Sequence, residues 1–352
     1  MTLIENVITS NNMYYNSKII GLGHYVPDNI VTNDDLSKVL DTSDQWIQTR
    51  TGIKERRWVT KESGDTAATM GLKAARIAIF KANLLPKDID FIIFATMTPD
   101  YYFPGCGVQV QAELGIKDIG ALDVRNQCSG FIYALSVADK FIKTGTYKNI
   151  LIIGAELHSG GLDKTPRGRD VSVIFGDGAG ALILSRTDEN KGILSTHLHS
   201  NGDYAEDLAV VGPSPRHGIG LDNHWIKSVQ DNKDATFYFP YMNGKSVFKH
   251  AVFKFSEVIM EGLLANDLNS TDVDLFIPHQ ANLRISEFVQ RQFKFKDNQV
   301  FNNIQKYGNT TAASIVIALD EAYEQGRIKD NDLVVLASFG SGYTWGSIII
   351  KW

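Results

Sequence analysis

The stretch LLPKDIDFII at residues 84–93 leads into a continuous apolar run, and it has a counterpart about half a chain later. The counterpart is LNSTDVDLFI at residues 268–277, which places the same Asp-x-Asp entry before a second apolar run. Apolar runs without alternation are typical of strands covered on both faces, so each is expected in a sheet sandwiched by helices. Because each stretch follows an apolar helical pattern, the repeat predicts one βα unit order used twice.

The repeat extends to two polar positions that precede helical patterns. Cys128 is followed by a pattern that ends at Gly145, and Asn309 by one of the same length that ends at Gly326. A strand-like run follows each of them. If the halves are related by a pseudo-twofold axis, these helices meet near the axis. Cys128 and Asn309 are then expected to face one cavity.

The remaining pattern predicts an α/β protein with alternating strands and helices. Strands are expected at residues 89–94, 150–153, 273–277 and 333–337, and helices at 66–82, 131–143, 247–264 and 312–325. We divide the chain into an N-terminal extension (1–17), an N-terminal half (18–188) and a C-terminal half (189–352).

Composition excludes several classes of function. With 43% hydrophobic and 21% charged residues and a net charge of −5, the chain lacks the basic stripe of a nucleic-acid-binding protein. Its longest apolar runs have strand length, so we expect no membrane span, and residues 1–17 lack the pattern of a secretory signal. Cys106 and Cys128 show neither CxxC nor CxxH spacing, so we expect no structural metal site and favour a reducing cytoplasm over a disulfide.

The segment DVRNQCSGFIYAL at residues 123–135 turns from a short strand, through a polar elbow, into an apolar helix. A thiol at a helix N-terminus lies near unpaired N–H groups and the positive end of the macrodipole, which favour the nucleophilic thiolate. The alternative is a small buried hydrophobe, as free cysteines commonly are.

Other segments carry polar groups at strand ends and turns. His279 follows a buried strand in IPHQANLRI (277–285), and Asn309 lies in KYGNTTAAS (306–314), where it would otherwise be an N-cap. The glycine-rich SFGSGYTWG (338–346) can bring backbone N–H groups close to a ligand. FGDGAGA (175–181) lacks GxGxxG spacing before a helix, which argues against nucleotide binding. A papain-like hydrolase is disfavoured, because no Trp-containing signature surrounds Cys128.

Together these segments closely resemble the beta-ketoacyl-[acyl-carrier-protein] synthase III family of thiolase-fold condensing enzymes. The resemblance is carried by residues 44–53, 123–135, 175–181, 278–284, 308–314 and 339–346, and it runs from about residue 18 to residue 352. It implies a five-layered αβαβα fold built from two pseudo-symmetric halves.

The resemblance implies a decarboxylating Claisen condensation that starts fatty acid synthesis. Cys128 takes the acyl group from an acyl-CoA, and malonyl-ACP then loses carbon dioxide to give an enolate that attacks the acyl-enzyme. His279 and Asn309 donate hydrogen bonds to the enolate, and the backbone N–H groups of Cys128 and Ser341 form the oxyanion hole. We expect no metal and no cofactor beyond the CoA and ACP thioesters.

The resemblance also assigns binding residues. The CoA-binding residues are Trp46, Arg50, Arg169, Phe248 and Asn282, with Arg167 as an alternative to Arg169. The residues that dock acyl carrier protein are Lys249, Arg284 and Arg291. Phe103 is expected to close the acyl pocket of a partner across a homodimer. Core packing for Trp46 and a solvated surface role for the basic residues are the alternatives.

Three departures from the family pattern leave the substrate open. Residues 125–127 replace small residues before the cysteine, Lys245 replaces a polar tunnel residue, and residues 204–241 form a longer stretch that could alter acyl or carrier choice. Ser341 stands where many relatives have glycine. A condensing enzyme of secondary metabolism that joins a longer acyl chain to a beta-ketoacyl partner is therefore an alternative. A non-catalytic thiolase-like subunit and a thioester hydrolase are less favoured, since Cys128, His279 and Asn309 are all present.

Overall fold

Two sheets organise the protein, and a computed structural model describes residues 15–212, 214 and 238–352. The first sheet has the order β1-β7-β6-β4-β5 and the second the order β11-β12-β13-β8. The first sheet contains β1 (Asn16–Tyr25), β4 (Phe91–Ala95), β5 (Gly120–Val124), β6 (Asn149–Glu156) and β7 (Gly178–Thr187). The second contains β8 (Gly192–Ser200), β11 (Leu275–Pro278), β12 (Leu333–Gly340) and β13 (Thr344–Lys351).

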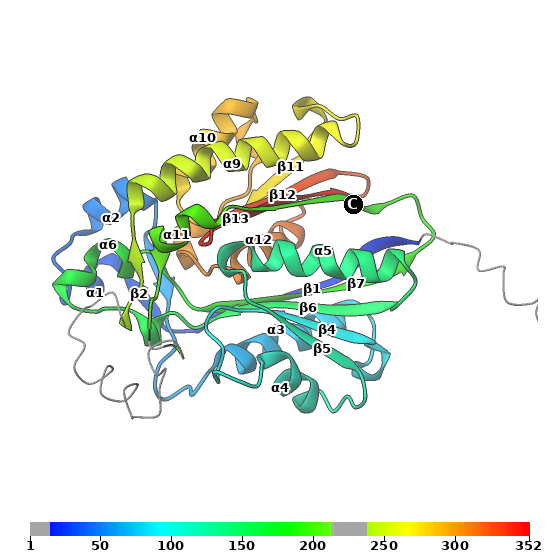
Figure 1. The fold of residues 1–352 in the computed structure, drawn as a ribbon, viewed down its shortest axis with the longest axis horizontal. Helices are drawn as coiled ribbons and strands as arrows, with labels where there is room; N and C mark the ends of the chain where they lie inside the picture. Colours follow the sequence, from blue (N-terminus) through cyan, green and yellow to red (C-terminus); the bar gives the residue numbers. More distant parts are fainter. Residues whose placement is uncertain (1–14, 213, 215–237) are drawn as a thin grey trace, which may run out of the picture.

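Helices cover both sheets and fill the space between them, which gives five layers (Figure 1). Helices α3 (Ala67–Lys81) and α4 (Cys106–Glu113) cover the outer face of the first sheet. Helices α5 (Gly130–Lys143) and α12 (Ala313–Glu324) lie between the sheets, and α9 (Gly244–Leu264) and α10 (Leu283–Phe293) cover the second sheet. The five-layered αβαβα fold is thereby confirmed.

Short elements complete the described chain around one end of the layers. They are β2 (Ile30–Thr32), α1 (Asn33–Ser37), α2 (Asp44–Thr51), β3 (Glu55–Arg57), α6 (Arg169–Ser172), β9 (Leu208–Ala209), β10 (Tyr241–Met242) and α11 (Ile304–Tyr307). Strand β9 pairs with β10 as a small two-stranded sheet.

The central helices bring the two halves of the repeat together. A Cβ atom built on Gly130, the first residue of α5, would lie 3.7 Å from the Cβ atom of Ala312, which precedes α12. The two helix starts therefore meet, as the internal repeat predicts. Parallel strands lead into this region, because β5 pairs in parallel with β4 and β11 with β12.

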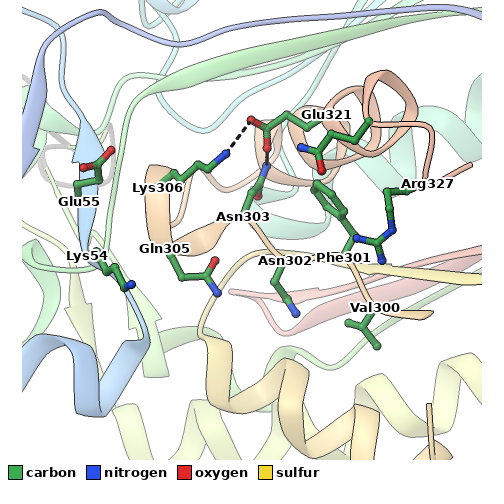
Figure 2. A pocket seen from close by; sticks show the side chains of 11 residues that line it. Lys54, Glu55, Val300, Phe301, Asn302, Asn303, Gln305, Lys306, Glu321 and Arg327 are labelled. Atoms are coloured by element: carbon green, nitrogen blue, oxygen red, sulfur yellow. Dashed lines mark hydrogen bonds and ion pairs between the residues drawn. The ribbon is translucent and has the colours of Figure 1, made fainter. Parts of the chain in front are cut away.

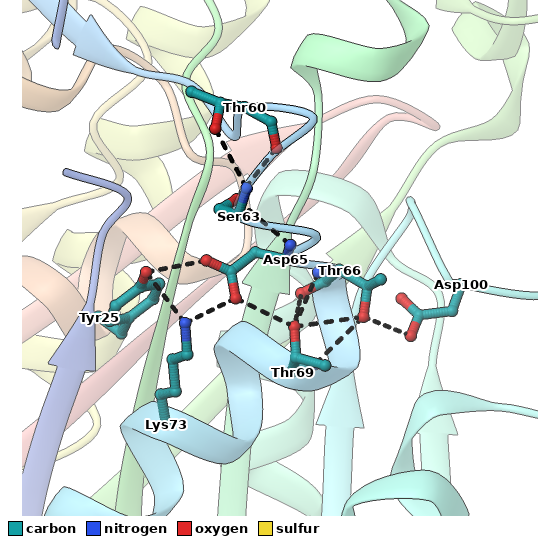
Figure 3. A network of polar contacts seen from close by, with 8 residues as sticks. All are labelled: Tyr25, Thr60, Ser63, Asp65, Thr66, Thr69, Lys73 and Asp100. Carbon is teal, nitrogen blue, oxygen red and sulfur yellow. Dashed lines mark hydrogen bonds and ion pairs between the residues drawn. The ribbon is translucent and has the colours of Figure 1, made fainter. Parts of the chain in front are cut away.

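A network of polar side chains fixes the start of α3 (Figure 3). Thr66 caps the helix by accepting a hydrogen bond from the Thr69 N–H, and its hydroxyl donates to Asp100 over 2.7 Å. Asp65 accepts hydrogen bonds from Lys73 over 2.6 Å and from the Tyr25 hydroxyl over 2.9 Å. This network explains why the helical pattern begins where it does, and it lies on the outer side of the first sheet.

The structure corrects one boundary of the sequence interpretation. Strand β1 begins at Asn16, and the Ser17 side chain is fully buried with its hydroxyl donating to Asp139 over 2.5 Å. The extension expected over residues 1–17 therefore overlaps the first sheet, while residues 1–14 lie outside the described residues. All strands of the first sheet precede residue 188 and all strands of the second follow residue 191. Of the long stretch 204–241, only residues 204–212, 214 and 238–241 are described.

No helix of the described ranges has the length and apolar character needed to cross a bilayer.

Candidate active site

Cys128 lies in a 3₁₀ turn (Gln127–Ser129) between β5 and α5, and the second half of the chain holds this elbow in place. The Ser338 hydroxyl donates to the backbone oxygen of Cys128 over 2.8 Å. A Cβ atom on Gly340 would lie only 2.6 Å from the Cβ atom of Cys128, so this position requires glycine. The glycine at the end of β12 thus packs directly against Cys128.

The electrostatics around Cys128 differ from the expectation of a stabilised thiolate. Burial raises the pKa of the Cys128 thiol to about 12, and the nearby Glu156 carboxylate acts in the same direction. The backbone N–H groups of Ser341 and Cys128 itself donate to the sulfur and oppose the rise. The expected thiolate is therefore not the stable form of the resting site: the thiol is, because segments from the second half of the chain help to bury it in largely apolar surroundings.

This burial predicts how the thiol responds to pH. The thiolate fraction is expected to rise about tenfold per pH unit between pH 7 and 9, because the raised pKa lies above this range. The rate of alkylation of Cys128 by iodoacetamide, followed by intact-mass spectrometry, should rise in parallel without a plateau. A plateau below pH 8 would show that the helix N-terminus outweighs burial.

His279 follows directly after β11, and the structure holds its ring in one orientation. Its Nδ1 atom lies 2.6 Å from the Ser314 hydroxyl oxygen, which also accepts the Gln280 N–H over 3.3 Å. The Ser314 hydroxyl can therefore donate to Nδ1, which leaves the ring hydrogen on Nε2. Within the described residues, Nε2 is buried and has no hydrogen-bond partner. Burial lowers the pKa of His279 to about 3, so the ring is a neutral donor.

Asn309 lies in a turn between α11 and α12, where neighbouring backbone fixes it. Its N–H donates to the Ile174 oxygen over 2.9 Å, and its backbone oxygen accepts the Gly176 N–H over 3.1 Å. Its side-chain oxygen accepts the Thr311 N–H over 2.8 Å, which leaves the amide NH₂ to donate elsewhere. The glycine-rich segment of residues 175–181 thus helps to hold this asparagine.

Cys128, His279 and Asn309 line one narrow cavity of about 100 Å³, as expected if the two halves meet at the site. Apolar residues form most of its wall, which includes Phe248 on α9 and Leu208 on β9. A second cavity of about 370 Å³ also reaches Cys128. Its lining residues include Met97, Leu162, Val210 and Pro240, with Arg125 and Ser341 among the polar groups. The two cavities therefore share Cys128 as a lining residue, together with Phe175 and Leu208.

One buried carboxyl was missed by the sequence interpretation. Glu156 ends β6 with no exposed surface, and it accepts hydrogen bonds from the Met97 N–H and the Thr98 hydroxyl. It also accepts from Thr311 and the Ala312 N–H beside the Asn309 turn. Burial raises the pKa of Glu156 to about 7. The sequence feature that could have revealed Glu156 is an acidic residue at the C-terminal end of a long apolar strand.

Two guanidinium groups lie close to the Trp46 ring, which is partly exposed. The Arg50 group lies 4.4 Å and the Arg169 group 4.9 Å from the Trp46 ring centroid. Arg167 instead donates to Asp163 over 2.7 Å. The structure therefore groups Trp46 with Arg169 rather than with the alternative Arg167.

The remaining predicted residues lie around the narrow cavity and beyond it. Asn282 and Phe248 line it, and the Arg284 guanidinium lies 5.4 Å from the Phe248 ring centroid. Lys249 and Arg291 are exposed on α9 and α10, and Arg291 lies 4.0 Å from Glu287. Phe103 is 81% exposed in the loop between β4 and α4 and lines neither cavity at Cys128.

A larger hollow of about 610 Å³ lies elsewhere and contains none of these residues (Figure 2). Its wall carries both signs of charge: Lys306 lies 3.8 Å from Glu321, and Asn303 donates to the same carboxylate over 2.9 Å. The part of the chain that the structure describes holds no cluster of three or more His, Cys, Asp or Glu side chains placed to bind a metal ion.

Comparison with known proteins fits this geometry. Family models described as 3-oxoacyl-[acyl-carrier-protein] synthase III match residues 122–202 and, for the C-terminal part, 263–352. Beta-ketoacyl-[acyl-carrier-protein] synthase III of Histophilus somni is 44% identical over 335 residues, which cover 95% of this chain and 99% of that protein. The chain belongs to the beta-ketoacyl-[acyl-carrier-protein] synthase III family. It is thus a condensing enzyme of the acyltransferase type.

Other members of the synthase III family agree along almost the whole chain. The synthase III of Caldanaerobacter subterraneus is 41% identical over 334 residues, which cover 95% of this chain and 97% of that protein. The crystal structure of 3-oxoacyl-[acyl-carrier-protein] synthase III from Aquifex aeolicus has a TM-score of 0.85 at 42% identity, with coverage of 96% and 100%. The five layers and the order of the motifs are therefore those of a synthase III.

Proposed function

We propose that this protein condenses an acyl-CoA starter with malonyl-ACP through an acyl-Cys128 intermediate, giving beta-ketoacyl-ACP for the initiation of fatty acid synthesis. The observation that carries the proposal is the shared cavity lined by Cys128, His279 and Asn309. It is supported by the second cavity that reaches Cys128, whose partly apolar wall offers space for an acyl chain.

In the first half-reaction the Cys128 sulfur attacks the carbonyl carbon of the acyl-CoA. The carbon–sulfur bond to CoA breaks, and CoA leaves as a thiol that takes up the cysteine proton. The N–H groups of Cys128 and Ser341 donate to the sulfur in the resting site, and we propose that they donate to the developing oxyanion during attack. Because the thiol pKa is raised, deprotonation is expected to accompany attack rather than precede it.

In the second half-reaction the malonyl thioester loses carbon dioxide, and the electron pair of the broken bond forms an enolate. The neutral His279 Nε2–H and the Asn309 amide donate to its oxygen. The enolate carbon then attacks the carbonyl carbon of the acyl-enzyme, the bond from that carbon to the Cys128 sulfur breaks, and the departing thiolate takes up a proton from solvent. These groups supply the stabilisation that a metal would otherwise give, so we propose that no resident cofactor is needed.

We further propose that Trp46, Arg50 and Arg169 bind the nucleotide end of CoA. An indole offers a face for stacking, and two guanidinium groups offer donors to phosphate. We propose a cytoplasmic homodimer, which is supported by the two free cysteines and by the exposed Phe103. Phe103 would then reach the acyl cavity of a second copy.

Basic residues near the narrow cavity are proposed to dock the acidic carrier protein. Replacing Arg284 with glutamate is expected to raise the apparent KM for malonyl-ACP about tenfold while changing that for acyl-CoA far less, because Arg284 is proposed to contact the acidic carrier, whereas Arg50 and Arg169 are proposed to hold the CoA phosphates. Steady-state kinetics with each substrate varied in turn measure both constants. Lys87→Glu, an equal charge change at an exposed position in the turn before β4, is the control. Equal effects of Arg284→Glu on both substrates would contradict carrier docking.

A panel of acyl-CoAs from acetyl to dodecanoyl tests the proposed function. Intact-mass spectrometry follows loading of the protein, and malonyl-ACP is then added to detect beta-ketoacyl-ACP. Loading by short chains followed by extension supports an initiating synthase. Loading by long chains only, or loading without extension, would assign the protein to secondary metabolism instead.

A further inference from the structure

Asp207 ends a 3₁₀ segment (Gly202–Asp207) directly before β9, and it is a junction between three parts of the chain. Its Oδ2 atom accepts a hydrogen bond from the Tyr343 hydroxyl over 2.8 Å. Its Oδ1 atom accepts from the Asn243 side chain over 3.1 Å, and its backbone oxygen accepts from the Asn243 N–H over 2.7 Å. The Ser246 hydroxyl donates to the same carboxylate. One side chain thus joins three separate segments.

Each of these segments forms a wall of the narrow cavity that contains Cys128. Leu208, the residue after Asp207, lines it from β9. Val247 and Phe248 line it from the first turns of α9, which Asn243 caps. Gly340 lines it from the turn that continues to Tyr343. Asp207 itself does not line this cavity, so it can act on a bound molecule only through the walls.

The turn between β12 and β13 contacts the Asp207 segment at two further points. The Ser341 hydroxyl donates to the Leu208 backbone oxygen, while the Ser341 N–H faces the Cys128 sulfur. The Tyr343 ring stacks on Tyr204 with ring centroids 5.3 Å apart and an interplanar angle of 15°. Tyr343 is 1% exposed, so its hydroxyl would be costly to leave without a partner. The hydrogen bond between Asp207 and Tyr343 therefore links the position of the β12–β13 turn, which carries Ser341, to the position of Leu208.

The surroundings of Asp207 favour its charged form. It lies at the N-terminal end of α9, where the macrodipole favours negative charge. Hydrogen bonds from Ser246 and Tyr343 lower the pKa of Asp207, and His250 faces it from the next turn of α9. Hydrogen bonds to a charged acceptor are stronger than those between neutral groups, so this junction is well suited to hold its three segments in one geometry.

We propose that Asp207 is a positioning residue that sets the width of the narrow cavity that contains Cys128, called the thioester tunnel below. Through Tyr343 and Asn243 it fixes β9 and the start of α9 against the turn between β12 and β13. This role rests on the proposed function, in which the pantetheine arm of the substrate fills the narrow cavity. A substrate with the full arm depends on all three walls. A short thioester that leaves most of the tunnel empty depends on them much less.

The test compares acyl transfer from an acyl-CoA with transfer from the same acyl group on N-acetylcysteamine, which lacks most of the arm. Asp207→Ala is expected to lower kcat/KM for acyl-CoA about tenfold, the effect of losing one or two charge-assisted hydrogen bonds, mainly through KM. The N-acetylcysteamine substrate should change less than threefold. Asp207→Asn, which keeps one acceptor oxygen, should fall between Asp207→Ala and the parent.

Tyr343→Phe is a second, milder test of the same hydrogen bond, for use if Asp207→Ala folds poorly. It removes only the hydroxyl, and its effect on acyl-CoA should match that of Asp207→Ala in direction. The double variant should be no worse than the worse single variant, because both changes break one junction. Equal losses for the two substrates, or additive losses in the double variant, would overturn the positioning role. If the parent protein loads no acyl group from any acyl-CoA, the proposed function fails instead, and this role with it.

Discussion

Replacement of Cys128 with serine is expected to abolish the covalent acyl-enzyme, with loading from acyl-CoA falling by at least about 10³-fold. The thiol is already held in its protonated form by burial, and an alcohol in the same place ionises far less readily. The neutral His279, with a pKa of about 3, is a poor base to compensate. Intact-mass spectrometry after incubation with acyl-CoA reads the result directly.

Cys106→Ser is the matched control for this experiment. Cys106 begins α4, is fully buried and is also a free thiol, yet it lies in neither cavity that reaches Cys128. Burial raises its pKa to about 12 as well, so the two thiols differ in place rather than in acidity. Cys106→Ser should load normally. An acyl adduct that persists in Cys128→Ser and disappears in Cys106→Ser would reverse the assignment of the nucleophile.

His279→Ala and Asn309→Ala should separate the two half-reactions. Each is expected to slow loss of carbon dioxide from malonyl-ACP by about 10²–10³-fold, because each removes one donor to the developing enolate. Loading of Cys128 from acyl-CoA should change much less, since the N–H groups of Cys128 and Ser341 remain. Release of labelled carbon dioxide and intact mass of the acyl-enzyme measure the two steps in one sample.

Two substitutions of the same type test the specificity of that result. His197→Ala removes a histidine from β8 that lies beside Glu261, and Asn302→Ala removes an asparagine from the separate hollow of Figure 2. Neither should change carbon dioxide release. If His279→Ala and Asn309→Ala also leave it unchanged, both residues lie outside the mechanism, and the shared cavity has another use.

The repeat allowed much of the fold and the meeting of Cys128 with Asn309 to be predicted, because buried strands and helix starts depend on local pattern. His279 was found for a related reason, since it follows a buried strand. The acidity of Cys128 was predicted with the wrong sign. Local sequence shows a helix start, but the burial that outweighs it comes from segments far along the chain.

The contacts of Asp207 also could not be predicted from the sequence. Nothing in its local sequence distinguishes it from a surface carboxyl, and its partners Asn243 and Tyr343 are distant in the chain. The choice between Arg167 and Arg169 also needed three dimensions, because only the position of Trp46 decides it. Contacts between distant side chains are what a single sequence leaves open.

The bond from Ser338 to Cys128 joins residues 210 positions apart, and Gly340 packs against the same cysteine. During synthesis the N-terminal part of a chain leaves the ribosome first, so the nucleophile emerges long before the turn that encloses it. Until β12 and β13 follow, the Ser341 N–H that donates to the sulfur is missing, and the contacts from Ser338 and Gly340 that enclose the thiol have not formed. The surroundings of this nucleophile are therefore completed by strands that follow it by about two hundred residues.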